Sequence, residues 1–205
     1  MNKYLVKSSL FACILFLFTS CTTANKTGNL EFKNFSKQED IHLLGDTKAP
    51  KASLEVNVEF PIKGDTEILE WVQSEVSSFN FGKKFTSLKN QEAIDLFAQD
   101  YKKGYLGDVE PLYKEELENN ENKEDVGHWY NYEITLQSKP ILYKNNLLVI
   151  ESLSYEYTGG AHGISLIHYL NLDLATKSII TFEELFLPNV KDELTELIKQ
   201  QLMKD

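Results

Sequence analysis

The sequence contains no arginine, so all 21 of its basic residues are lysines. Its 31 acidic residues outnumber them, which gives a formal net charge of −10 over 205 residues. An acidic chain repels phosphate groups, and without a guanidinium group it cannot make the bidentate hydrogen bonds that hold them best. We therefore expect no nucleic-acid partner.

Cysteine is almost as scarce, since Cys13 and Cys21 are the only two and both lie near the N-terminus. A disulfide framework is therefore excluded for the rest of the chain. The Ser-x-x-Lys and Gly-x-Ser-x-Gly motifs of serine hydrolases are also missing. We expect no catalytic residues and no cofactor.

Long apolar runs are missing too, because the longest one, Leu10–Phe18, has nine residues. A membrane-spanning helix needs about 20. The run follows Lys3 and Lys7 and precedes Thr19-Ser20-Cys21, an order that resembles a bacterial lipoprotein signal peptide. The resemblance implies that residues 1–20 are removed and that lipid on Cys21 anchors the protein to a membrane of the cell envelope. An ordinary signal peptide that ends near a cysteine is the alternative.

Residues 21–50 are polar and carry no sustained hydrophobic period. We interpret them as a flexible tether that the fold does not need.

From residue 51 the hydrophobic pattern becomes regular. It predicts one strand and then two helices, with Asp65 and Asn90 at their N-caps. Gly104 and Gly107 are expected to end the second helix, and the acidic stretch 108–125 is expected to form a short helix and a solvated loop. The strand carries apolar side chains at alternate positions: Leu54, Val56, Val58 and Phe60.

Beyond residue 129 the period changes to two, which predicts several antiparallel strands. The alternating sets are Tyr130, Tyr132, Ile134 and Leu136; Leu147, Val149, Leu153, Tyr155 and Tyr157; and Ile164, Leu166, His168, Leu170 and Leu172. A last helix after Pro188 is expected to turn its apolar stripe inward: Val190, Leu194, Leu197, Ile198 and Leu202. The whole pattern predicts an α+β fold, an antiparallel sheet with helices packed on one side.

A glycine-rich heptapeptide lies between two of these strands: Tyr157, Thr158, Gly159, Gly160, Ala161, His162 and Gly163. Three glycines in five residues predict positive φ angles or a close approach of the backbone at a hairpin. The His162 ring is expected to fix the hairpin by hydrogen bonds to the main chain or to a neighbouring strand. We interpret the heptapeptide as a binding or hairpin-organising site.

This heptapeptide, with Asn171-Leu172-Asp173-Leu174 and Glu183-Glu184-Leu185-Phe186 after it, resembles the domain of RsiV-like proteins. The same domain accompanies PdaC-like accessory domains of peptidoglycan deacetylases. The resemblance implies a PdaC-like domain over residues 51–138 and a partial RsiV-like domain over 139–205, packed as one compact unit. The family continues into further strands after the final helix, so the sheet is expected to be incomplete on its C-terminal side.

The resemblance also implies a role in the cell envelope. The deacetylase reaction belongs to a separate catalytic domain, for which we find no counterpart in this sequence. We therefore expect a non-catalytic, lipid-anchored binding module that recognises peptidoglycan or another cell-wall glycan, or a protein partner. A lysozyme-binding sensor or inhibitor-like lipoprotein is an alternative, because an acidic domain suits a basic partner.

A metal-dependent envelope hydrolase is a further alternative, which would use His162 and His168 as ligands. On extended chain these two residues lie about 20 Å apart, at about 3.3 Å per residue. A zinc site needs three or four protein ligands around one ion. We therefore expect no metal site.

Overall fold

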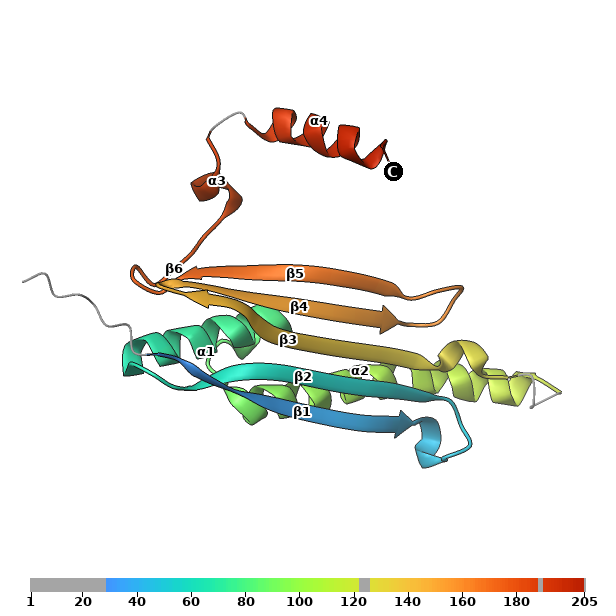
Figure 1. Cartoon of the computed structure of the whole chain (residues 1–205). Helices are drawn as coiled ribbons and strands as arrows, with labels where there is room; N and C mark the ends of the chain where they lie inside the picture. The colour runs from blue at the N-terminus through green and yellow to red at the C-terminus, as the bar shows by residue number, and fades with distance from the viewer. Residues whose placement is uncertain (1–28, 122–125, 188–189, 205) are drawn as a thin grey trace, which may run out of the picture.

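The computed structural model describes residues 29–121, 126–187 and 190–204, and it confirms the α+β architecture (Figure 1). The predicted signal peptide and Cys21 lie outside the described residues. The described strands form one sheet in the order β1-β2-β3-β4-β5-β6. Their bounds are β1 Glu31–His42, β2 Lys51–Lys63, β3 Tyr132–Lys144, β4 Leu147–Tyr157, β5 Ile164–Asp173 and β6 Ser178–Ile179.

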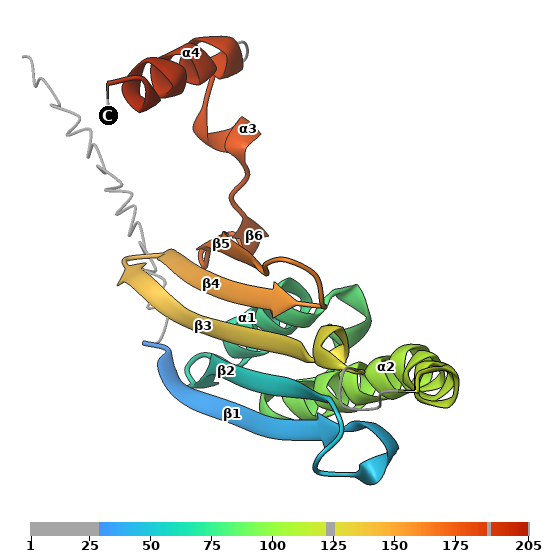
Figure 2. The same cartoon turned by 90° about the vertical axis from the view of Figure 1, so that its right-hand side faces the viewer.

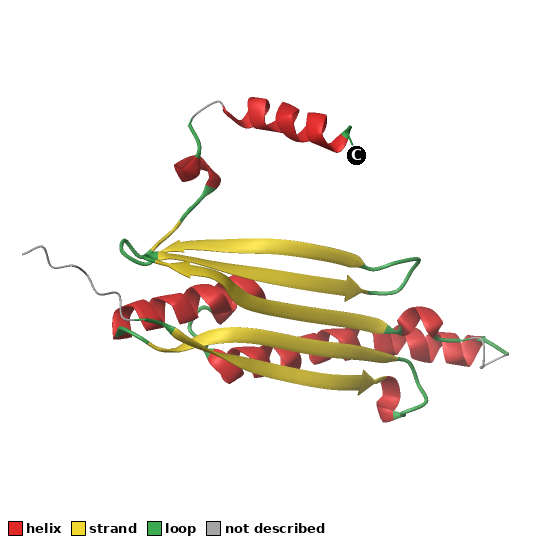
Figure 3. Cartoon of the chain, viewed as in Figure 1, coloured by secondary structure: helices red, strands yellow, loops and turns green. Residues whose placement is uncertain are grey.

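The sheet is mixed, because β2 and β3 run parallel while the other neighbouring pairs run antiparallel. Parallel neighbours need a long crossover connection. Two helices supply it, α1 over Thr66–Phe81 and α2 over Asn90–Asn119. Both helices lie on the same face of the sheet (Figures 2 and 3). Among the described helices, none combines the length and hydropathy that a bilayer span requires.

The predicted tether over residues 21–50 is wrong from residue 31, because Glu31–His42 is the edge strand β1. It pairs along its length with β2, from Glu31 opposite Lys63 to His42 opposite Lys51. Leu30, Ile41 and Leu43 are buried at or just beyond its ends. This segment therefore belongs to the folded domain.

Helix α2 does not end at Gly104 and Gly107 but continues through both to Asn119, and Pro111 lies inside it. Tyr105, Val109 and Tyr113 are buried on its inner face. Their packing outweighs the cost of two helical glycines, about 1 kcal/mol each relative to alanine. The short helix expected in the stretch 108–125 is therefore a continuation of α2 by about three turns, as far as Asn119.

The main hydrophobic core fills the space between the two helices and the covered face of the sheet. Strand β2 supplies its centre, as the alternation predicts, with Leu54, Val56, Val58 and Phe60 almost fully buried. Strand β4 contributes Leu148 and Ile150, which lie on the opposite side of the strand from the predicted set Leu147, Val149 and Leu153. That set faces away from the helices.

The C-terminal elements α3, over Phe182–Leu185, and α4, over Val190–Leu202, stand away from the sheet (Figures 1 and 2). The prediction that α4 turns its apolar stripe inward is therefore wrong, since α4 has no buried residue. Leu197, Ile198 and Leu202 are all more than half exposed. The neighbouring strand β5 also exposes Ile164, Leu166 and Ile167.

Candidate functional site

The glycine-rich hairpin joins β4 to β5, as the sequence predicts. Gly159 has φ 85° and Gly160 has φ 97°, which confirms the expected positive φ angles. A Cβ atom on Gly159 would lie 2.5 Å from the carbonyl oxygen of Trp129, so this position has no room for a side chain. A Cβ on Gly163 would meet the ring of Tyr155 at 2.6 Å. The hairpin is therefore packed tightly against its surroundings at both ends.

The side chain that fixes the hairpin is Tyr157, whose hydroxyl donates a hydrogen bond to the carbonyl oxygen of Gly160 at 3.0 Å. The prediction gave this role to His162, and it is wrong. The His162 side chain is exposed and has no hydrogen-bond partner among the described residues. Tyr157 lies at the end of β4, from where its hydroxyl contacts the turn, whereas the His162 side chain is exposed to solvent. Thr158 and Ala161 lie in the same turn.

The two histidines considered as metal ligands lie in different parts of the structure. His168 is on β5, opposite Ser152 of β4, and His162 is in the turn before that strand. Within the described residues, no group of three or more histidine, cysteine or acidic side chains is arranged to hold a metal ion.

An aromatic cluster lies against the hairpin, built around the short 3-10 helix His128–Tyr130 that precedes β3. The ring centroids of Trp129 and Tyr130 are 5.9 Å apart, and those of Tyr130 and Tyr113 are 5.5 Å apart. Tyr105 of α2 packs on Tyr132 at 5.3 Å, and its hydroxyl donates to the carbonyl oxygen of Tyr130 at 2.8 Å. These contacts fix the short helix on α2, and the short helix in turn contacts Gly159.

Trp129 is the exposed member of this cluster. Its side chain is held by a hydrogen bond from Nε1 to Oε2 of Glu116 at 3.2 Å, yet the residue is 47% exposed. A large indole that is both oriented and open to solvent is a common feature of binding surfaces. Trp129 was not among the predicted site residues, although the aromatic run from Trp129 to Tyr132 directly after an acidic stretch is visible in the sequence.

Glutamate side chains lie near two tyrosines of this region, Tyr130 and Tyr101. Burial raises the pKa of Tyr130, and the neighbouring Glu116 adds to the shift. Burial also raises the pKa of Tyr101 to about 12, with a further contribution from the charge of Glu156. The raised pKa values keep both phenols neutral at neutral pH.

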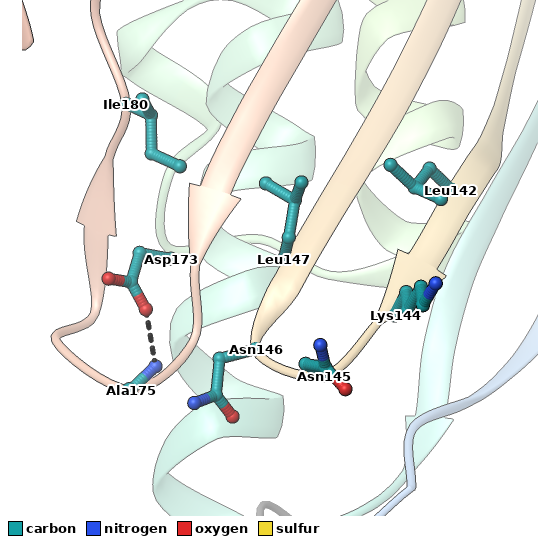
Figure 4. A pocket seen from close by; sticks show the side chains of 8 residues that line it. All are labelled: Leu142, Lys144, Asn145, Asn146, Leu147, Asp173, Ala175 and Ile180. Atoms are coloured by element: carbon teal, nitrogen blue, oxygen red, sulfur yellow. Dashed lines mark hydrogen bonds between the residues drawn. The ribbon is translucent and has the colours of Figure 1, made fainter. Parts of the chain in front are cut away.

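A hollow lies at the opposite end of the sheet from the hairpin, between the β3–β4 and β5–β6 turns (Figure 4). Its volume is about 550 Å³, and Leu142, Leu147 and Ile180 form its apolar wall. Its acidic group, Asp173, accepts a hydrogen bond from the backbone N–H of Ala175 at 2.8 Å (Figure 4). Asp173 thus caps its own turn, so we regard this hollow as a consequence of turn geometry.

The fold and the site together define a two-layer α+β domain with a fixed aromatic end. A sequence model of the family described as deacetylase PdaC matches residues 51–165. The expected PdaC-like domain covered 51–138, so the match begins at the same residue and extends through the glycine-rich hairpin. The chain therefore belongs to the PdaC family.

Two solved structures carry the comparison further. A DUF3298-family protein from Bacteroides fragilis NCTC 9343 is 35% identical with a TM-score of 0.81, over 87% of this chain and 70% of that one. A DUF3298-family protein from Pseudomonas aeruginosa PAO1 is 14% identical with a TM-score of 0.50, and it shares the fold alone. The chain spans 62% of the length of that second protein. A comparison with curated proteins gave no match.

Proposed function

We propose that this protein is a non-catalytic binding module of the cell envelope, anchored by lipid on Cys21, that recognises cell-wall glycan. The observation that carries the proposal is the exposed indole of Trp129, held by Glu116 where the Trp129 main chain packs against Gly159. Aromatic faces stack on the apolar faces of sugar rings, and an oriented ring loses little entropy on binding.

Peptidoglycan is the glycan we favour. The family is described by the name of a deacetylase, and the RsiV-like resemblance of the heptapeptide also points to the cell wall. The lack of arginine and the acidic balance leave few groups that could hold a phosphate-rich polymer, so we favour the sugar and peptide part of the wall.

The test is sedimentation of the full chain, solubilised in detergent, with purified peptidoglycan. We expect Trp129→Ala to lower the bound fraction at least tenfold, because the stacking surface is lost. Tyr169→Ala is the matched control, since Tyr169 is an aromatic residue that is 52% exposed on β5, away from the hairpin. Equal binding by Trp129→Ala and the control would contradict the proposal. The same supernatants should contain no acetate released from the polymer, and acetate that depends on His162 or His168 would instead favour the hydrolase.

A basic protein such as lysozyme is the second candidate partner. The net charge of −10 and the carboxylates near Trp129 favour it, because complementary charge speeds and strengthens association. Binding to lysozyme that weakens steeply with salt, in the absence of any binding to peptidoglycan, would favour this alternative. Glycan stacking should depend little on salt.

A further inference from the structure

Away from the edge strand β1, the covered face of the sheet is interrupted by a row of polar residues on β3, β4 and β5. Across β3, β4 and β5, the residues Ser138, Ser152 and His168 stand directly opposite one another in a single row. This row continues the core positions Leu148 and Ile150 of β4, so serine and histidine replace aliphatic side chains there. Polar groups are costly at such positions unless they have partners.

Only part of this row is paired. The Ser152 hydroxyl donates to Oδ1 of Asn80 at 2.9 Å, and Asn80 is itself fixed by a bond from Nδ2 to the carbonyl oxygen of Val76. The hydroxyl oxygen of Ser138 is buried and has no hydrogen-bond partner among the described residues. The core therefore contains unused hydrogen-bonding capacity beside an ordered polar pair.

A cavity of about 270 Å³ lies at this place, between the C-terminal end of α1, α2 and the strands. Its lining includes Phe79, Asn80, Phe97, Ser152, Glu156 and His168. Ser152 is buried while Glu156 and His168 are exposed, so the cavity opens from the core to the solvent. The volume is just below the range for small-ligand sites, about 300 to 1,000 Å³, so the cavity suits one ring rather than a long ligand.

The lining restricts the chemistry of the ligand. It contains a carboxylate and no lysine, so an anionic ligand is disfavoured. The proton of Ser152 is committed to Asn80, so this hydroxyl can only accept. Glu156 also accepts, and Ser154, another lining residue without a partner among the described residues, can donate or accept. Two phenylalanine rings and mostly accepting polar groups match a ring that carries several hydroxyl donors.

We propose that this cavity binds a single neutral sugar ring of the cell-wall glycan. Phe79 and Phe97 contact its apolar face, and Ser152, Ser154 and Glu156 accept hydrogen bonds from its hydroxyl groups. The inference rests on the proposed glycan-binding function and adds a second, deeper subsite to the Trp129 surface.

The test uses the full chain in detergent and N-acetylglucosamine as the probe, with binding measured by saturation-transfer difference NMR. We expect Ser154→Val to weaken binding about tenfold, because the hydrogen bond is lost and apolar methyl groups replace the hydroxyl. Glu156→Gln should weaken it to a similar degree. Ser165→Val is the matched control, since Ser165 lies on the adjoining strand and faces away from the helices, opposite Tyr155. It should leave the affinity unchanged.

Three outcomes would overturn the inference. One is equal affinity of Ser154→Val and Ser165→Val for the probe. Another is tighter binding of the cationic sugar glucosamine than of N-acetylglucosamine, with the difference lost in Glu156→Gln. This would show that the cavity recognises an amine rather than a neutral sugar. The third combines two results: the wild-type chain shows no detectable binding of the probe, and its sedimentation with peptidoglycan is abolished by Trp129→Ala but not by Ser154→Val. This outcome would rule out the cavity as a sugar site and would leave the proposed function standing. Failure of the wild-type chain to sediment would count against the proposed function itself.

Discussion

Glycine is required at position 159 for two separate reasons. Its φ of 85° lies in the region that disfavours other residues, and the Trp129 carbonyl oxygen occupies the space of a side chain. Gly160 meets only the first requirement, because nothing lies within 4 Å of its Cβ position. Substitutions at these two adjacent glycines can therefore distinguish the cost of backbone strain from the cost of a steric clash.

Gly159→Ala should lower the free energy of unfolding by about 2 to 4 kcal/mol, as strain and a backbone clash combine. Gly160→Ala should cost only about 1 kcal/mol, the strain alone. Denaturant unfolding measures both, and His162→Ala serves as the reference at about 0.5 kcal/mol or less, since this side chain is exposed without a partner. A similar loss of unfolding free energy for both glycine variants would contradict the steric argument. It would show that the short helix His128–Tyr130 shifts to make room for the added methyl group.

At the scale of whole elements, β2 and β1 show what the sequence could and could not predict. Strand β2 is covered by both helices, so its inward residues are all apolar and the alternation is clear. Strand β1 lies at the edge, where Lys37 and Glu39 point to the covered side, as their partners Val56 and Leu54 do. These two reach α2 and pair with Asp95 and Lys102 rather than filling the core. Their charges hide the period that would have predicted a strand.

The candidate site was predicted only in part for a related reason. The hairpin at Gly159 and its positive φ angles follow from local sequence. The approach of Trp129 to Gly159, however, joins residues 30 positions apart through the packing of the short helix on α2. The same holds for Ser152 and Asn80, which are 72 positions apart. Neither contact leaves a local signal.

The length of α2 leads to a prediction about Gly104. This glycine lies in the helix with nothing within 4 Å of its Cβ position. Gly104→Ala should therefore raise the free energy of unfolding by about 0.5 to 1 kcal/mol, which for this size corresponds to a melting temperature about 1 to 4 °C higher. Gly82→Ala is the control, because Gly82 also has open space around it but has φ 96° at the end of α1. It should destabilise, and a stabilising result there would contradict the backbone argument.

At the scale of the whole molecule, the length of chain between Cys21 and the folded domain limits how far from the membrane the proposed module can reach. The described domain begins at residue 29, eight positions after Cys21. Because β1 follows so soon, little chain is left between the expected lipid and the folded sheet. The proposed module would thus work close to its membrane rather than at the end of the long tether first expected.

Cys21→Ala should release the protein from membranes, since the apolar run before it is too short for a stable anchor. Membrane fractionation after a high-salt wash measures this, and the wash removes protein held by charge alone. The wild-type chain should stay with the membranes throughout. Continued fractionation of the variant with membranes would rule out lipid on Cys21 as the anchor.

The parallel pairing of β2 with β3 has a consequence for how the chain folds. Ala52 lies opposite Tyr132, so forming this pair closes a loop of 80 residues, 132 − 52. The β4–β5 turn closes over only six, residues 158–163. On a logarithmic dependence of closure entropy on loop length, the central pairing costs about 2 kcal/mol more to close. The hairpins on either side form early, because their contacts are local. We therefore expect the pairing of β2 with β3 to be the slow step of refolding.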